Sequence, residues 1–179
     1  MNDHVIHAVT PDASRTATIG AVTVSDESAM PIDPLPLAHL AAFLLERLRL
    51  HPMCELSITA VDEARMSQLH LEWMDEPGPT DVLSFPMDEL RSAPVGTEPA
   101  VGVLGDIVLC PQVAASQAPE RGRSLDEELA FLLTHGMLHL IGYDHGTDEE
   151  VQEMFTLQDR LLAEWVGFSA GAPGSRGTR

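Results

Sequence analysis

A twelve-residue segment with three histidines places the strongest constraint on this chain. The segment 134–145 reads THGMLHLIGYDH. His135 and His139 are four residues apart, which places both side chains on one face of a helix. Gly142 follows, and glycine readily takes the left-handed conformation that ends a helix, so the chain can turn and bring His145 back. Three neutral imidazoles with an open fourth position are the ligand set of a catalytic zinc site. We therefore predict one zinc ion, held by these three histidines.

The alternative is that these histidines only pack in the interior or lie on the surface. His135 and His139 fall in an apolar run, where an unpaired imidazole carries a desolvation cost. Their joint spacing with His145 favours a metal site over simple packing. Imidazole also binds nickel, copper and iron, so the pattern leaves the metal open.

Length and composition indicate one globular domain. The chain has 179 residues, of which 44% are hydrophobic, enough for a single core. No apolar run has membrane-spanning length and the start of the chain does not resemble a signal peptide, so we expect no membrane association. Cys54 and Cys110 are isolated, which favours buried free thiols in a reducing compartment and a cytoplasmic location.

The charge balance argues against a protein that binds nucleic acid strongly and without sequence preference. The formal net charge is −18, from 28 acidic and 10 basic residues. Proteins that bind nucleic acid through overall charge carry a basic excess instead. A local basic patch remains compatible with this composition.

Hydrophobic periodicity predicts an α+β fold, with a mixed sheet of about four strands and the histidine-bearing helix at its centre. The predicted strands are 19–24, 55–61, 80–85 and 103–109. The predicted helices are 34–50, 63–74, 111–118, 125–141 and about 148–166. Residues 1–18 and 168–179 are expected to be a disordered extension and a disordered tail, on either side of one domain at 19–167.

Helix starts and core positions follow from local signals. Asp33 and Asp62 are predicted N-caps, and the pairs Ser124/Glu127 and Thr147/Glu150 match the capping box. Apolar stripes assign a further set of side chains to the core: Val151, Met154, Phe155, Leu161 and both tryptophans, Trp73 and Trp165.

Three segments resemble the YbeY family of bacterial metal-dependent endoribonucleases. They are HGMLHLIGYDH at 135–145, TDVLSFP at 80–86 and LGDIVL at 104–109, in the family's order, and the resemblance covers roughly 19–167. It implies a small α+β fold and a zinc ion bound by His135, His139 and His145. It also implies single-strand-specific RNA cleavage in rRNA maturation, at the 3′ end of 16S rRNA, and in ribosome quality control.

The resemblance also implies partners. These are rRNA and the small ribosomal subunit, with ribosomal proteins or an assembly GTPase as further candidates. Two routes to phosphodiester cleavage stay open: attack by a metal-activated water, or attack by the RNA 2′-hydroxyl while the metal polarises the phosphate.

One position departs from the family pattern. The family has an arginine shortly before its TDVLSFP block, and the matching position here is Met74, whose thioether cannot donate a hydrogen bond to phosphate. Either that arginine is dispensable in this chain or another residue replaces it. By charge alone the candidates are Arg47, Arg49, Arg121 and Arg123, although each taken singly is more simply interpreted as a solvated surface residue.

Two other functions fit the sequence less well. Zinc peptidases with similar histidine spacing carry a glutamate directly after the first histidine as general base, but this chain has Gly136 there. A metal-stabilised ribosome-assembly factor, acting mainly by protein binding, would explain the acidic charge.

Four polar residues have local interpretations. Asp144 is expected to stabilise its turn or to orient a ligand imidazole, and Asp81 to belong to a turn. Asp106 is expected to cap a loop, and Ser84 either lines a substrate groove or is an ordinary strand serine.

Overall fold

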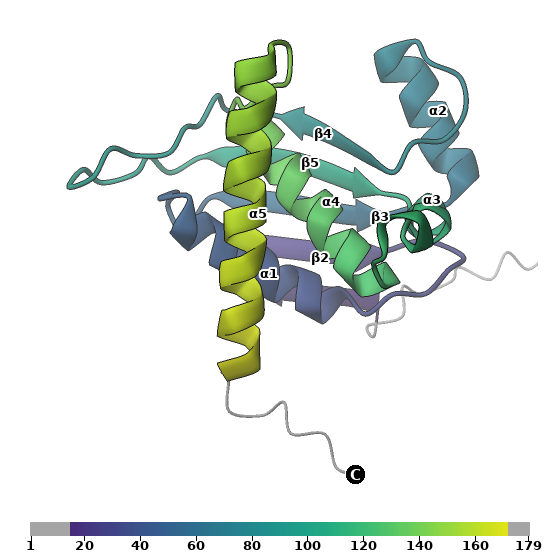
Figure 1. The fold of residues 1–179 in the computed structure, drawn as a ribbon, viewed down its shortest axis with the longest axis horizontal. Coiled ribbons are helices and arrows are strands. Elements are labelled where there is room, and N and C mark those ends of the chain that lie inside the picture. Colours follow the sequence, from purple (N-terminus) through teal and green to yellow (C-terminus); the bar gives the residue numbers. More distant parts are fainter. Residues whose placement is uncertain (1–14, 172–179) are drawn as a thin grey trace, which may run out of the picture.

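A five-stranded mixed sheet forms the centre of the computed structural model, which describes residues 15–171 (Figure 1). Its order is β1-β2-β3-β5-β4. The outer pairs β1/β2 and β4/β5 are antiparallel, whereas β2/β3 and β3/β5 are parallel. The strands are β1 (Thr16–Ile19), β2 (Val22–Asp26), β3 (Glu55–Ala60), β4 (Val82–Pro86) and β5 (Val103–Leu109).

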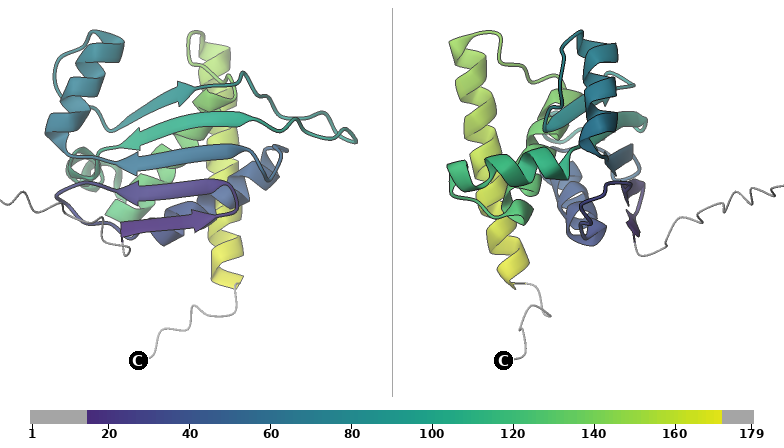
Figure 2. Two further views of the ribbon diagram at one scale, coloured as in Figure 1. Left: turned by 180° about the vertical axis from the view of Figure 1, so that it is seen from behind. Right: turned by 90° about the vertical axis from the view of Figure 1, so that its right-hand side faces the viewer.

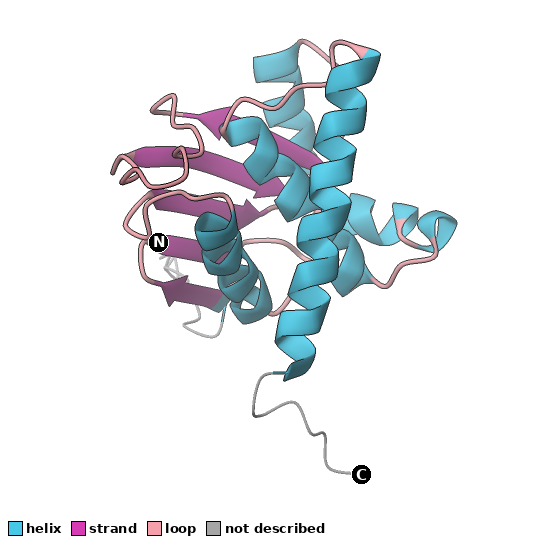
Figure 3. Cartoon of the chain, turned by 60° about the vertical axis from the view of Figure 1, so that its left-hand side comes forward, coloured by secondary structure: helices cyan, strands magenta, loops and turns pink. Residues whose placement is uncertain are grey.

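Most helices cover one face of this sheet (Figure 3). They are α1 (Pro34–Arg47), α2 (Glu63–Met74), α3 (Pro111–Gln117), the 3-10 turn η2 (Pro119–Arg121), α4 (Leu125–Leu140) and α5 (Asp148–Gly171). Helix α1 packs on β1 and β2, α4 packs on β4 and β5, and α5 lies across both helices. Seen from behind, the sheet is open apart from α2 near β4 (Figure 2). The predicted α+β class is confirmed, with the histidine-bearing helix between the sheet and α5.

The first predicted strand, 19–24, is in fact a hairpin, which accounts for the fifth strand. Gly20 takes a positive φ of 58°, and Ile19 pairs with Val22 across the turn. The boundary expected at residue 18 therefore differs, because β1 begins at Thr16. At the other end, α5 continues to Gly171 rather than ending near 166. The rest of the two expected disordered segments, 1–14 and 172–179, lies outside the described residues.

Most of the helix starts follow the predicted capping chemistry. Asp33 accepts the Leu35 N–H at 3.0 Å. The reciprocal bonds of a capping box are present at Ser124/Glu127 and at Thr147/Glu150. Asp62 is the N-cap residue of α2, as predicted, but its carboxylate accepts the Ala29 N–H at 2.6 Å and no helix N–H. This contact fastens the loop after β2 to the start of α2.

Burial of α4 confirms its predicted central place. Leu133, Met137 and Leu138 are inaccessible to solvent, so apolar packing on several sides holds the helix rigidly. Two assignments to the core were wrong. Trp73 is 61% exposed and Phe155 is 37% exposed, because the neighbours of these rings, Phe85 and His135, cover them only in part.

A very close approach between β4 and β5 depends on glycine. Gly105 has a φ of 142°, and a Cβ there would lie 2.2 Å from the backbone oxygen of Phe85. Any side chain at this position would force the two strands apart. Gly105 thus lets β4, the strand under α4, pair in its observed register.

Candidate metal centre

Helix α4 and the turn after it bring all three predicted ligands together. The Nε2 atoms of His135 and His139, one helical turn apart, are 3.1 Å from each other. Gly142 takes a φ of 96°, and the Gly142 and Tyr143 N–H groups cap the carbonyls of the last helical turn. The chain thereby reverses, and the ligand atoms of His135, His139 and His145 all lie within 4.8 Å of one another.

Hydrogen bonds fix which ring nitrogen of each helical histidine carries the proton. The Nδ1–H of His139 donates to the Tyr143 backbone oxygen at 3.0 Å, and a carbonyl can only accept. The Nδ1–H of His135 donates to Oε1 of Gln158 at 3.0 Å. Gln158 is held in this orientation because its Nε2 donates to the Phe131 backbone oxygen at 3.4 Å. Both Nε2 atoms therefore present lone pairs toward the same point.

Burial favours the neutral form of these two imidazoles by lowering the pKa of each. It lowers the pKa of His135, and the positive charge of a protonated His145 acts in the same direction, while the bond to Gln158 opposes the shift. Burial likewise lowers the pKa of His139, together with charge on His135 and His145. A metal ion requires the neutral form of its histidine ligands, so both shifts favour metal binding.

The donor set fits a divalent metal ion. Two unprotonated nitrogens at 3.1 Å repel each other unless a cation lies between them. In a tetrahedral zinc site with Zn–N distances of about 2.0–2.1 Å, ligand nitrogens lie about 3.3 Å apart. His145, whose side chain is 45% exposed, completes three ligands and leaves the side toward solvent open.

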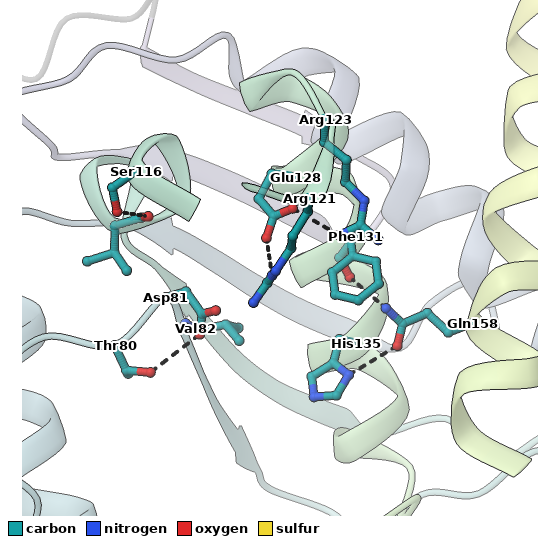
Figure 4. Close-up of polar contacts among 11 residues, drawn as sticks. Thr80, Asp81, Val82, Ser116, Arg121, Arg123, Glu128, Phe131, His135 and Gln158 are labelled. Atoms are coloured by element: carbon teal, nitrogen blue, oxygen red, sulfur yellow. Dashed lines mark hydrogen bonds and ion pairs between the residues drawn. The ribbon is translucent and has the colours of Figure 1, made fainter. Parts of the chain in front are cut away.

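A pocket of about 520 Å³ opens beside His135 and His145. Besides these histidines it is lined by Asp81, Val82, Arg121, Arg123, Phe131, Leu132, Phe155 and Asp159. Figure 4 shows Arg121 and Arg123 converging on Glu128, one turn before Phe131 on α4. The pocket therefore combines possible metal ligands, guanidinium groups, aromatic rings and two carboxylates.

The structure separates the four arginines that charge alone could not distinguish. Arg121 and Arg123 line the pocket. Arg47 pairs with Glu164 at 3.4 Å, and the Nε–H of Arg49 donates to the Ala93 carbonyl; neither lines the pocket. Met74, at the end of α2, is half exposed.

Other predicted residues have mainly structural contacts. Asp144 accepts the His145 N–H at 2.8 Å, which agrees with its turn interpretation. Asp81 accepts the Val82 N–H at 2.8 Å, also as a turn residue, although it lines the pocket as well. The Ser84 hydroxyl donates to the Gly136 carbonyl at 3.1 Å. Asp106 lines a groove on the opposite, open face of the sheet.

Gly136 has a packing role that the sequence did not suggest. A Cβ there would lie 3.0 Å from Ser84 Oγ and 3.3 Å from two carbons of Ile107. The position after the first histidine thus faces the sheet, where a glutamate has no room. This disfavours the peptidase alternative on steric grounds as well as chemical ones.

Three residues at the site were missed by sequence reasoning. Gln158 orients His135, and Phe155, assigned to the core, lies 5.8 Å ring to ring from His135. Asp159 lines the same pocket. All three lie on α5, and their only sequence signal is a helix beginning directly after the histidine block.

Fold and site together define a small α+β protein with a three-histidine centre able to hold a metal ion. The family model described as endoribonuclease YbeY matches residues 34–166, and the chain belongs to this family. Endoribonucleases YbeY from Thermobifida fusca and Micrococcus luteus are 54% and 56% identical over 145 and 154 residues. These matches cover 81% and 86% of this chain and 94% and 97% of those proteins.

A solved structure shares the fold. The solution structure of a Thermotoga maritima protein is 27% identical, with a TM-score of 0.57, and the match covers 87% of this chain and 99% of that one. Family membership supports an endoribonuclease role. No helix among residues 15–171 is both long enough and apolar enough to cross a membrane.

Proposed function

We propose that this chain is a zinc-dependent endoribonuclease that cleaves single-stranded rRNA, at the 3′ end of 16S rRNA during maturation and in ribosome quality control. It would act in the cytoplasm on the small ribosomal subunit, with ribosomal proteins or an assembly GTPase as partners. The observation that carries the metal-dependent chemistry is the convergence of His135, His139 and His145. Membership of an endoribonuclease family supports the substrate class.

The chain's own residues divide the work at such a site. The Gln158 and Tyr143 oxygens orient two imidazoles for metal binding, and the lowered pKa of each ring favours the neutral form that binds metal. When bound, a zinc ion supplies Lewis acidity and a water whose pKa is lowered to about 7. Asp81 and Asp159 are the carboxylates that line the pocket, and either could act as the general base or acid.

The test is cleavage of a single-stranded RNA containing the 16S 3′-end sequence by the purified protein, with metal content measured in parallel. The wild-type protein should contain about one zinc ion and lose cleavage when a chelator is added. A protein with both His135→Ala and His139→Ala should bind no metal and leave the RNA intact. Cleavage by that double variant at the wild-type rate would refute the proposal.

A second candidate is a ribosome-assembly factor that acts mainly by protein binding. The groove on the open sheet face favours it. Three acidic residues line this groove against one basic residue, next to exposed Trp73: Glu27, Glu72 and Asp106 against Arg65. An acidic groove with an aromatic edge suits a basic protein segment. Rescue of rRNA processing in cells by a zinc-loaded but cleavage-inactive variant would favour this function over catalysis.

A further inference from the structure

We propose that Arg121 and Arg123 form a binding site for an RNA backbone phosphate beside the metal centre. The inference rests on the proposed function, since it assumes that RNA enters this pocket. It assigns the recognition of one phosphate to Arg121 at the end of η2 and to Arg123 in the segment after it.

Both guanidinium groups are held at the wall of the pocket that contains His135. Arg121 donates to one carboxylate oxygen of Glu128, and Arg123 donates to the other at 3.0 Å. In Figure 4, Arg121 extends from its turn toward Asp81 and Val82, at the start of β4, which line the same pocket. The same pocket is lined by both arginines and two of the histidines, so an RNA chain at the metal passes them.

The buried carboxylate leaves most of the donors free. A guanidinium has five N–H groups in a planar fork, and the structure shows Glu128 accepting from one nitrogen of each arginine. The Glu128 side chain is fully buried, whereas those of Arg121 and Arg123 are 41% and 30% exposed. Solvent-facing donors therefore remain on both arginines, and the cluster carries one net positive charge.

An aromatic ring restricts the motion of both arginines. The Arg123 guanidinium carbon lies 3.9 Å from the centroid of the Phe131 ring, and that of Arg121 lies 5.9 Å away. Ordering a flexible arginine on binding costs conformational entropy, and here stacking and the ion pairs have already restricted it. Planar, bidentate donors held in place are well suited to phosphate oxygens.

Asp81 and Asp159 also line the pocket. The Asp81 carboxylate accepts the Val82 N–H and the Thr80 hydroxyl, so one of its oxygens is already engaged within its own turn. The simpler alternative is that the two arginines serve only to neutralise the buried carboxylate of Glu128. The two roles differ in one respect: a purely structural ion pair makes no contribution to RNA affinity.

Removing the negative charge and removing an arginine therefore give opposite results. Glu128→Gln keeps both arginines and increases the cluster's net charge, so RNA affinity should rise about two- to fivefold. Arg121→Gln combined with Glu128→Gln removes one cation without leaving a buried unpaired carboxylate. RNA affinity should then fall about tenfold relative to Glu128→Gln, and the slope of log K against log salt should weaken by about 0.7.

The assay measures binding of a short single-stranded 2′-O-methylated oligonucleotide to the zinc-loaded protein by fluorescence anisotropy, between about 50 and 200 mM salt. Arg47→Gln is the matched control, because Arg47 also has a glutamate partner, Glu164, and an aromatic neighbour, Phe43. This control should leave affinity, slope and cleavage unchanged. Thermal melting and zinc content should show that every variant is folded and loaded.

Three outcomes would overturn the inference. If wild-type protein binds and cleaves RNA but the double variant keeps the affinity and salt slope of Glu128→Gln, only the phosphate site is wrong. If wild-type protein neither binds nor cleaves RNA, the proposed function fails and this inference fails with it. An equal loss in Arg47→Gln would show that the effect is one of overall charge, and would also refute a local site.

Discussion

Gln158 provides the sharpest test of how the site is built, because it acts on a ligand from another helix. Gln158 is fully buried and accepts the Nδ1–H of His135 at 3.0 Å. Replacement by leucine keeps a side chain of similar volume but removes both hydrogen bonds. The substitution therefore tests orientation of the ligand rather than loss of packing.

The expected effect has two parts. In the metal-free protein, Gln158→Leu leaves a buried imidazole N–H without an acceptor, which should lower the free energy of unfolding by about 1–3 kcal/mol. Loss of the partner that orients a metal-bound histidine typically weakens metal affinity by about 10–100-fold. At saturating zinc, the variant should therefore lose about 1.4–2.7 kcal/mol more than it does without metal.

Urea unfolding with and without zinc measures both parts, and competition with a chelating dye gives the zinc Kd directly. Gln152→Leu is the control, since it makes the same change at an exposed position of α5 and should alter neither quantity. A zinc Kd for Gln158→Leu within about twofold of wild type would refute the orienting role, because the proposed effect is at least about tenfold.

Three further changes have defined outcomes. Gly105→Ala should lower the free energy of unfolding, measured in urea, by more than about 3 kcal/mol, because the alanine Cβ would clash with the Phe85 backbone oxygen. A loss below about 1 kcal/mol would contradict this. Burial raises the pKa of Asp26, but hydrogen bonds from Ser28, Ile32 and Arg15 outweigh this effect and lower the pKa overall. The ionised carboxylate therefore stabilises the fold above about pH 3.9, and this stabilisation should be lost as the pH falls through the folded-state pKa. Asp26→Asn should flatten that acid limb of the stability profile. The pKa of both His135 and His139 is lowered in the folded protein, so the free energy of unfolding of the metal-free protein should decline as the pH falls below about 6.5. The double variant His135→Gln, His139→Gln should abolish that decline when unfolding is measured over a range of pH.

Local chemistry made much of the fold predictable. The capping boxes at Ser124 and Thr147 specify helix starts within four residues of sequence. Gly142 likewise marks the end of α4, since few residues other than glycine adopt the positive φ found there. The three histidines were predictable as a group because helical periodicity and one turn determine their relative positions.

The features that could not be predicted from the sequence depend on contacts between segments that are far apart along the chain. Gln158 lies 23 residues from His135, and no local pattern distinguishes it from any other glutamine on α5. Trp73 and Phe155 were assigned to the core because periodicity identifies an apolar face but not whether another element covers it. The hairpin at Gly20 was missed since β-branched and apolar residues continue through its turn.

The hydrogen bond from His139 to the Tyr143 carbonyl, just before the turn that carries His145, bears on how a metal ion would enter and leave the site. His135 and His139 are held in place on a buried helix, whereas His145 lies beyond the turn with an exposed side chain. An incoming ion would thus meet two ligands held on a buried helix, and the exposed His145 would complete its coordination. Metal exchange would then require displacement of this exposed turn alone, so we expect that zinc can be loaded or removed by a chelator without unfolding of the protein.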